Sequence, residues 1–294
     1  MTAQTWIDRT RDLLLAGTVE NLNRLNGSID DNMSSSSLTL EFNAGPIVVG
    51  SVIELGTELM YVTSVSAQQV GVMRAYGGSS ISSHANSTIV RSNPQYPSHQ
   101  ILNCLNDDLN DLSAKGLYQI KTKDFTYTSG TDGYDLASDC QAVQRVTYTD
   151  TSGDLSEPEI RRYDIRRNRN SSTFSSTVAL VLFDGATSGQ NVRVEYRAPY
   201  ASLTNSSSAL SGTGLHAEAY DLPPLGAALA LMTMKPIPRE SITTQAPMRR
   251  SEEVPSGAIS ASLRDLRFRR QERITAEVAR LAQMYPTTWV RSGR

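Results

Sequence analysis

The side chains best suited to catalysis are few and lie apart in this sequence. His84, His99 and His216 are widely separated, and neither Cys104 nor Cys140 has a histidine beside it. The chain has no GxSxG, HExxH, GxGxxG or Walker A motif, the patterns that place a nucleophile, a metal ion or a phosphate in a defined geometry. Two cysteines outside any metal-ligand spacing also indicate a reducing compartment. We therefore expect a structural or binding protein without cofactor or metal, not an enzyme.

An acidic stretch is the alternative place for chemistry, because it holds Asp107, Asp108 and Asp111. A hydrolase with a metal ion at these carboxylates is one hypothesis. On a helix, however, successive residues diverge by about 100°, so only Asp107 and Asp111, four residues apart, share a face. We therefore interpret this stretch as a solvated or subunit-facing acidic side of a helix.

A basic stretch, RRYDIRRNRN, places five arginines within nine residues. On a strand, Tyr163 and Ile165 would face one way and Asp164 the other. Cationic side chains of this kind bind DNA phosphates without sequence specificity, but no exposed aromatic platform accompanies them. Contact with an acidic neighbouring subunit is therefore our preferred interpretation, with DNA as the alternative. The five arginines are Arg161, Arg162, Arg166, Arg167 and Arg169.

Residues 50–91 combine strand-like alternation with three polar side chains, Glu58, Arg74 and His84. Glu58 and Arg74 fall on neighbouring predicted strands, where an ion pair across a sheet contributes roughly 0.2–1 kcal/mol. His84 lies in a Ser-rich loop, and no nucleophile or carboxylate has a sequence relation to it. We therefore expect these three residues to hold the module and its loop in shape, not to perform chemistry.

The same stretch carries a recognisable order of short motifs. ELMYV at 58–62 is followed by VMR at 72–74, YGG at 76–78, His84 and IVR at 89–91. In this order the motifs resemble a small β-module of the head-to-tail adaptor (connector, or neck) proteins of tailed bacteriophages.

Two positions depart from the family pattern, and a second region extends the resemblance. The family usually has Gly after the Arg and Thr after the Gly pair, where this chain has Ala75 and Ser79. Farther along, a strand ending in YRA precedes a helix rich in Leu and Ala, as in the family. The resemblance touches residues 38–112 and 189–285.

Hydrophobic spacing predicts four helices. Residues 3–25 carry a loose apolar stripe, and residues 94–116 carry a regular one, with Pro97 suited to the first turn and Gly116 to the end. Residues 224–235 are apolar on nearly all sides, so that helix must be buried. A basic helix of residues 256–285 would be about 45 Å long.

Period-two alternation predicts the remaining elements as strands. Residues 38–93 read as short strands of a small β-barrel-like module, and residues 117–201 as five strands of an antiparallel β-sandwich. Val192, Val194 and Tyr196 are expected on its buried face. The predicted class is thus α+β: helical core elements, a small β-barrel-like module, an antiparallel β-sandwich and a long C-terminal helix.

Six segments follow from this assignment. They are an N-terminal helix and linker (1–37), the β-module (38–93), an amphipathic helix (94–116), the sandwich (117–201), a connector with the apolar helix 224–235 (202–255), and the basic C-terminal helix and tail (256–294).

Charge is unevenly distributed along the chain. Residues 1–150 hold 9 Lys and Arg against 16 Asp and Glu, and residues 151–294 hold 19 against 14. A subunit with an acidic part and a basic part suits assembly through contacts between surfaces of opposite charge, although two solvated faces would give the same pattern. The N-terminus has no signal-peptide pattern, and no apolar run approaches the ~20 residues that span a bilayer. We therefore expect no membrane contact.

The resemblance implies a structural virion protein. It would form a ring of twelve copies in the virion neck, between the portal vertex and the tail, around the DNA channel, after assembly in the host cytoplasm. Implied partners are the portal protein, neighbouring copies, downstream neck or tail proteins, and DNA bound without sequence specificity. An alternative is a tail-associated or baseplate β-protein that binds a host-surface glycan through Tyr127, Tyr134, Tyr148 and Tyr163.

In the adaptor hypothesis the basic C-terminal helix docks on the portal or on a neighbouring copy. The side chains expected at that contact are Arg264, Arg267, Arg269, Arg270, Arg273, Ile274, Val278, Leu281, Tyr285 and Trp289.

Overall fold

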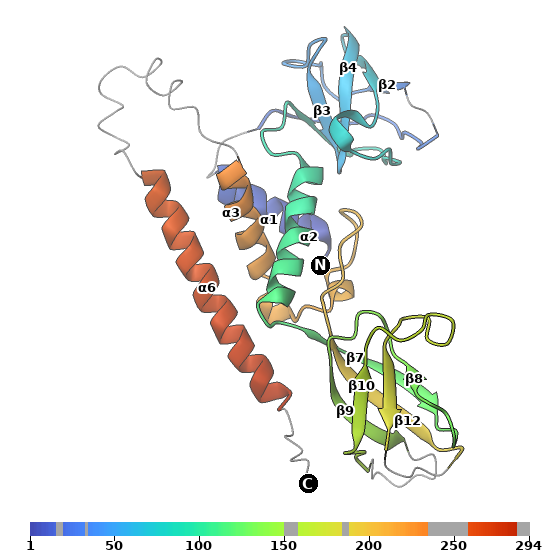
Figure 1. The fold of residues 1–294 in the computed structure, drawn as a ribbon. Coiled ribbons are helices and arrows are strands. Elements are labelled where there is room, and N and C mark those ends of the chain that lie inside the picture. Colours follow the sequence, from blue (N-terminus) through green and yellow to red (C-terminus); the bar gives the residue numbers. More distant parts are fainter. Residues whose placement is uncertain (16–19, 33–34, 150–157, 184–187, 235–257, 287–294) are drawn as a thin grey trace. The chain divides into compact units, whose positions relative to one another are not determined.

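The computed structural model describes residues 1–15, 20–32, 35–149, 158–183, 188–234 and 258–286 (Figure 1). These residues belong to two compact units. Unit 1 comprises Met1–Leu109 and Ser202–Glu272, and unit 2 comprises Asn110–Ala201 and Arg273–Arg294. The class is mixed α and β with antiparallel sheets, in agreement with the sequence. Among the described helices, none has both the length and the hydropathy needed to cross a membrane.

The four α-helices of the described chain lie where hydrophobic spacing predicts them. They are α1 (Ala3–Leu15), α2 (Ser98–Ala114), α3 (Leu222–Met234) and α6 (Ala258–Met284). Helix α2 begins directly after Pro97. Gly116 follows its C-terminus with φ 93°, the positive φ that commonly ends an α-helix and that glycine adopts readily. The whole predicted stripe of α2, Ile101, Leu105, Leu109 and Leu112, is buried.

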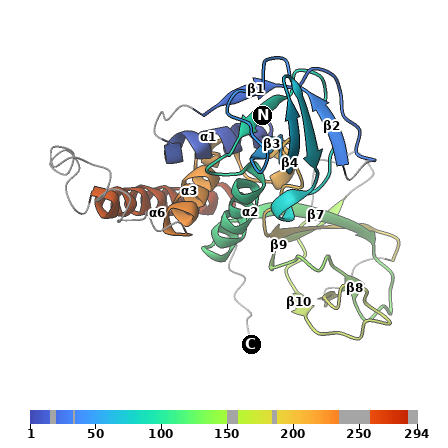
Figure 2. The ribbon, with the colours of Figure 1, turned by 90° about the horizontal axis from the view of Figure 1, so that it is seen from above.

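The β-module in unit 1 is one curled, six-stranded antiparallel sheet, with β1 and β2 at its two edges (Figure 2). An antiparallel bridge between Leu25 and Leu40 links the two edges, and Asn26 N–H donates to the Thr39 carbonyl at 2.7 Å. Apolar side chains such as Ile53, Met60 and Val72 fill its interior. The strands are β1 (Leu22–Arg24), β2 (Ser35–Thr39), β3 (Val52–Leu55), β4 (Glu58–Ser66), β5 (Gln69–Met73) and β6 (Ile89–Ser92).

The predicted boundary between N-terminal helix and β-module is wrong. The helix expected over 3–25 ends at Leu15, and Leu22–Arg24 forms β1, which pairs with β6. Within the expected linker 26–37, Ile29 exchanges two backbone hydrogen bonds with His84, and its side chain lies in the core of the module. The module therefore begins near residue 22, because these apolar residues serve the sheet instead of a helix stripe.

The stretch 202–214 is also more ordered than a flexible connector. The N–H groups of Ala3 and Gln4, at the start of α1, donate to the carbonyls of Ser208 and Ser206, both at 2.8 Å. These bonds satisfy helix donors that have no partner inside the helix. The stretch contains the short helix η2 (Leu210–Thr213), and η3 (Ala217–Ala219) follows it. Helix α3 packs against α1. The rings of Trp6 in α1 and Tyr220, just before α3, meet in a T-shaped arrangement.

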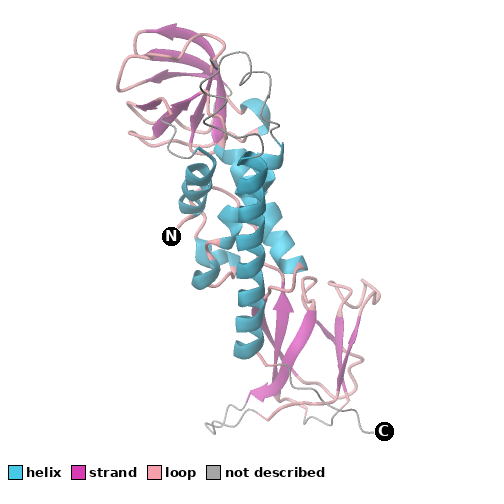
Figure 3. Ribbon diagram, turned by 90° about the vertical axis from the view of Figure 1, so that its left-hand side faces the viewer, coloured by secondary structure: helices cyan, strands magenta, loops and turns pink. Residues whose placement is uncertain are grey.

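Unit 2 contains two three-stranded antiparallel sheets, in the orders β7-β12-β9 and β10-β11-β8. Figure 3 draws the strands in magenta. Both sheets contribute to one apolar core, with Val192, Val194 and Tyr196 of β12 buried as predicted. The strands are β7 (Gln119–Thr126), β8 (Tyr134–Asp135), β9 (Ala142–Thr149), β10 (Tyr163–Arg166), β11 (Ala179–Leu182) and β12 (Asn191–Ala198).

Candidate functional site

Glu58, Arg74 and His84 meet in one buried cluster of the β-module. Glu58 begins β4, and Arg74 follows the end of β5, the neighbouring strand. Arg74 donates from Nε to Glu58 Oε1 at 2.9 Å and from Nη2 to Oε2 at 2.7 Å, a two-pronged contact. His84 Nε2 lies 2.9 Å from Glu58 Oε2, and Ser82 N–H donates to the same oxygen at 3.0 Å. The predicted Glu58–Arg74 pair is confirmed.

The cluster also fixes the backbone around it. Arg74 donates to the carbonyls of Asp30 and Ser82, so one side chain ties together two loops that lie far apart in sequence. Burial on its own raises the pKa of Glu58, but the hydrogen bonds from His84, Arg74 and Ser82 outweigh it and lower the pKa to about 2. Glu58 is therefore held as a carboxylate at the centre of the loop.

The same geometry does not form a catalytic triad. In a triad the carboxylate and the nucleophile bind opposite nitrogens of the histidine. Here Ser82 Oγ, at 3.4 Å, and Glu58 Oε2 both approach His84 Nε2. The His84 ring lies next to Gly56, and no carboxylate of the described residues contacts its other nitrogen, Nδ1. The cluster therefore lacks the geometry of a triad, and its expected role in holding the loop in shape stays a prediction.

The Gly-rich loop after Arg74 contains three residues with left-handed backbone conformation. Ala75 adopts the left-handed conformation with φ 54°, and Gly77 and Gly78, in η1 (Tyr76–Gly78), also have positive φ. Glycine adopts this conformation without strain, whereas an L-residue with a Cβ does not. A glycine would therefore fit position 75 with less strain than Ala75, whose N–H donates to Glu58 Oε1 at 3.3 Å.

A second buried ionic cluster, which sequence reasoning missed, joins β3 to the helices of unit 1. Glu54 of β3 accepts bonds from the Ser98 N–H at 2.6 Å, the Ser98 hydroxyl at 2.8 Å and Arg11 at 3.0 Å. Its carboxylate therefore caps the N-terminus of α2, where an anion is favoured. Burial raises the pKa of Glu54 despite the nearby Arg11 charge. The sequence carries one signal for this cluster: Glu54 lies between the apolar residues Ile53 and Leu55 in a predicted strand.

A third ionic contact joins α2 to α6. Arg270 Nη2 lies 2.5 Å from Asp108 Oδ1, and both side chains are buried. The Asp108 carboxylate lies against Gly226 of α3, where a Cβ would overlap it. We call Asp108 and Gly226 the Asp108 notch. The acidic side of α2 is thus only partly solvated: Asp107 is exposed, Asp111 pairs with Lys115 at 2.8 Å, and Asp108 is not available to a metal ion.

The predicted partner-binding residues of α6 divide into distinct groups. Arg270, Ile274 and Leu281 are buried within the chain itself, and a partner contact through them stays a prediction. Arg273, Val278 and Tyr285 are half-buried. Tyr285 lies beside Tyr118, and Gln144 donates to its carbonyl at 3.2 Å. Trp289 lies outside the described residues. The exposed remainder is Arg264, Arg267 and Arg269.

An aromatic side chain that the sequence analysis missed completes this exposed face. Phe268 is 63% exposed and lies one helical turn after Arg264, with Arg267 beside it. Arg269 instead pairs with Asp265 at 2.8 Å along the helix. The exposed face of α6 is therefore defined by Arg264, Arg267 and Phe268.

The arginines of residues 161–169 engage local partners in unit 2. Arg161 and Arg166 pair with Glu159 and Asp164, at 3.7 Å and 3.2 Å. Arg167 donates to the carbonyls of Cys140 and Gln141, and Arg169 lies over the Phe174 ring. Arg162 is exposed. Because several of these cations already have local acceptors, the stretch offers a weaker phosphate-binding surface than its composition implies.

The remaining candidate metal ligands and nucleophiles do not converge within the described residues. No three His, Cys, Asp or Glu side chains of this part lie together as a metal site requires. Cys104 and Cys140 are buried, and burial raises the pKa of both thiols, which keeps them unreactive. The tyrosines that a glycan site would use, Tyr127, Tyr134, Tyr148 and Tyr163, are each half-buried. Tyr127 and Tyr134 lie together, with ring centroids 6.0 Å apart, and Phe125 stacks on Tyr134.

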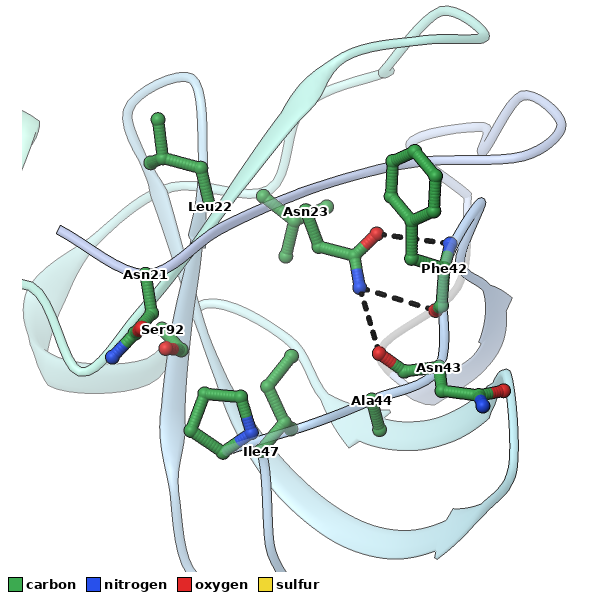
Figure 4. Close-up of a pocket in the computed structure, with 10 residues that line it drawn as sticks. Asn21, Leu22, Asn23, Phe42, Asn43, Ala44, Ile47 and Ser92 are labelled. Carbon is green, nitrogen blue, oxygen red and sulfur yellow. Dashed lines mark hydrogen bonds between the residues drawn. The ribbon is translucent and has the colours of Figure 1, made fainter.

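The β-module carries a pocket of about 190 Å³ (Figure 4). Its lining combines apolar residues such as Leu22, Phe42 and Ile47 with asparagines. Asn23 is committed to the fold, because its amide donates to the Phe42 and Asn43 carbonyls and accepts from Phe42 N–H. No titratable side chain lines the pocket, so it has no means of acid–base catalysis.

Comparison with known proteins adds no family to this description. A scan against protein-family models finds no match, and a search of curated proteins finds no similar sequence.

Proposed function

We propose that this protein is a structural component of a phage virion, a ring that connects the portal vertex to the tail around the DNA channel. The observation that carries the proposal is the buried Glu58–Arg74–His84 cluster. These are the residues on which the resemblance to head-to-tail adaptors rests, and they lie together with Glu58 bonded to both of the others. The support for the proposal is that these three residues lie together in one buried unit.

The character of the polar clusters supports a binding role over turnover. Each of the carboxylates Glu58, Glu54 and Asp108 is buried and engaged by an arginine of another element. Buried ion pairs of this kind fix how elements are placed more than they add stability. A protein that must present surfaces at set positions in a ring benefits from such pairs.

The exposed face of α6 is the proposed docking surface for the portal. An exposed aromatic side chain between arginines matches the composition of binding hot spots, which are enriched in aromatic residues and Arg. Phe268, Arg264 and Arg267 meet this description, and their exposure leaves them accessible. The proposed portal surface is correspondingly acidic with an apolar pocket. Neighbouring copies, later neck or tail proteins and channel DNA are the other proposed partners.

Binding to purified portal rings tests this proposal. Deleting the C-terminal helix is unsuitable, because it would remove Ile274 and Leu281 from buried positions. The paired variant Arg264→Glu with Arg267→Glu, and Phe268→Ala separately, should each weaken portal binding at least about tenfold, as hot-spot truncations do.

A matched control carries the same charge change elsewhere in unit 1. Arg9 and Arg24 are exposed, so Arg9→Glu with Arg24→Glu should leave portal affinity close to that of the wild type. Light scattering of the wild-type protein with portal would show whether a ring forms. Wild-type protein that does not bind portal rings at all would rule out the proposed function.

A further inference from the structure

The wall of the β-module opens between β1 and residues 42–47. Strands β1 and β2 are the two edges of the sheet, and the bond from the Glu41 N–H to the Arg24 carbonyl, at 2.8 Å, joins β1 to the chain that follows β2. At Leu22, by contrast, no backbone hydrogen bond of the described residues reaches residues 42–47. The pocket of about 190 Å³ lies there, lined from both sides of the opening.

The backbone of Leu22 faces this opening. In an antiparallel pair, residues that exchange hydrogen bonds alternate with residues whose N–H and C=O point to the other side. Ser92 N–H donates to the Asn21 carbonyl at 3.2 Å. Leu25 N–H donates to the Thr88 carbonyl at 2.9 Å, so the odd-numbered residues of β1 bond to β6. Leu22 therefore turns its N–H and C=O away from β6, and neither has a partner among the described residues.

One side-chain amide already bonds across the opening. Asn23 donates to the carbonyls of Phe42 and Asn43, at 3.1 and 3.3 Å, and accepts from the Phe42 N–H at 3.2 Å (Figure 4). These are the kinds of bond that the peptide groups of an added strand would make. The Asn23 amide thus occupies the position of a peptide group at one end of the opening, and the unpaired Leu22 backbone continues it.

The pocket has an apolar floor and an exposed apolar rim. Ala44, Ile47 and Val90 line it and are buried, whereas Leu22 and Phe42 at its rim are 57% and 60% exposed. Exposed apolar side chains that gather at one place mark interaction sites. The pocket is smaller than the roughly 300–1,000 Å³ of sites for drug-sized ligands. Its volume therefore suits one apolar side chain of a larger partner.

Charge around the opening is balanced. Arg91 lies opposite Leu22 in the β1–β6 pair and is met by Glu20 at 3.1 Å. Arg24 and Glu41, which are joined through their backbones, are exposed and carry opposite charges. The ten lining residues include no titratable side chain, so an ionised group placed there would lose water without gaining a partner. The complementary occupant is therefore uncharged.

We propose that this opening binds an extended, uncharged peptide segment of a partner protein. The segment adds to the edge of β1 through the Leu22 N–H and C=O, and it places one aliphatic side chain in the pocket. Strand addition of this kind takes affinity from main-chain hydrogen bonds and specificity from a side-chain pocket. The inference concerns the β-module alone, so it goes beyond the proposed ring and does not depend on it.

Short blocked peptides test the site by NMR titration of the ¹⁵N-labelled full chain. The probe is acetyl-Thr-Thr-Leu-Thr-Thr-amide, which we expect to shift the Leu22 and Ala44 amide signals with a Kd on the order of 1 mM. One matched peptide carries Asp in place of Leu. In another, the two threonine nitrogens beside the leucine are methylated, because these would face Leu22 when the leucine points inward. Each should bind at least about tenfold more weakly.

Two protein variants remove the same features from the other side. Leu22→Pro deletes the N–H that faces the opening, and proline is tolerated on an edge strand at such a position; Leu22→Ala is the matched control that keeps this N–H. Ala44→Leu fills the pocket. We expect Leu22→Pro and Ala44→Leu to lose binding and Leu22→Ala to retain it. Should Leu22→Pro fail to fold, the methylated peptide still measures the same hydrogen bonds.

Each result decides the inference. Binding of the leucine peptide, with the expected losses, supports it. Equal binding of the methylated peptide overturns strand addition, and unchanged binding to Ala44→Leu overturns the pocket as the site. The absence of any shift at peptide concentrations up to about 10 mM overturns the proposal as a whole. Shifts that grow with protein concentration without peptide would assign the opening to a second copy of this chain and overturn the peptide partner.

Discussion

Replacing Glu58 by glutamine is the sharpest test of how the β-module is held together. The Glu58 side chain is fully buried and accepts bonds from Arg74, His84 and Ser82. Glu58→Gln keeps the size of the side chain but leaves the buried Arg74 guanidinium facing a neutral amide. Removing one partner of a buried ion pair costs about 3–5 kcal/mol. We expect a loss of this size at pH 7, measured by urea unfolding.

The pH dependence of the same difference follows from the pKa of Glu58. This pKa is lowered from 4.5 to about 2 in the folded chain. A carboxyl group with a lowered folded pKa contributes stability that is present above its unfolded pKa and lost as the pH falls toward the folded value. The shift corresponds to about 3 kcal/mol. The stability gap between wild type and Glu58→Gln should therefore narrow as the pH falls from 4.5 to about 2.

Glu54 is a matched control, because its pKa is shifted in the opposite direction from that of Glu58. Burial raises its pKa above 4.5, so its contribution is fully present below the unfolded pKa and is lost as the pH rises through the folded pKa. The difference in unfolding free energy between wild type and Glu54→Gln should therefore narrow as the pH rises, the reverse of the Glu58→Gln difference. Equal pH slopes for the two variants, or a loss below about 1 kcal/mol for Glu58→Gln at pH 7, would refute the reasoning.

Three further substitutions test other contacts by thermal or urea unfolding. Gly226→Ala should destabilise the chain by about 1–3 kcal/mol, because the added methyl overlaps the Asp108 carboxylate; an unchanged stability would mean that the notch is not close-packed. Ala75→Gly should stabilise it by about 0.5–1 kcal/mol, since the residue has φ 54°, and any loss would contradict the strain. Arg193→Ala should cost less than about 1 kcal/mol, because its pair with Asp124 is largely exposed; a larger cost would show that Arg193 supports more than this pair.

The local sequence pattern predicts an element correctly where a single apolar stripe or a single apolar–polar alternation determines which side chains are buried. Helix α2 has a regular apolar stripe between Pro97 and Gly116, and both its position and its buried face follow from the sequence. The alternation of β12 likewise predicts which side chains are buried. The Glu58–Arg74 pair was predictable because the two residues lie on adjacent strands of one hairpin.

Contacts between distant segments left no such signal. Asp108 and Arg270 are 162 residues apart, and Arg11 and Glu54 are 43 apart. On α6 the arginines all look solvent-facing in the sequence, and nothing local distinguishes the buried Arg270 from the exposed Arg267. Leu22 and Leu25 fit a helix stripe equally well, because three-residue spacing over a short run does not separate a helix from a strand.

The three buried ion pairs support the proposed structural role. Glu58–Arg74 fixes a loop of the β-module, Glu54–Arg11 holds the module to α1 and α2, and Asp108–Arg270 holds α6 to α2. Apolar pairs of the same size would often hold these places equally firmly. A charge pair additionally selects one relative position of the two elements, because only that position brings the opposite charges together. Fixed register at each junction would suit the proposed ring, because every copy would then present its surfaces at the same positions.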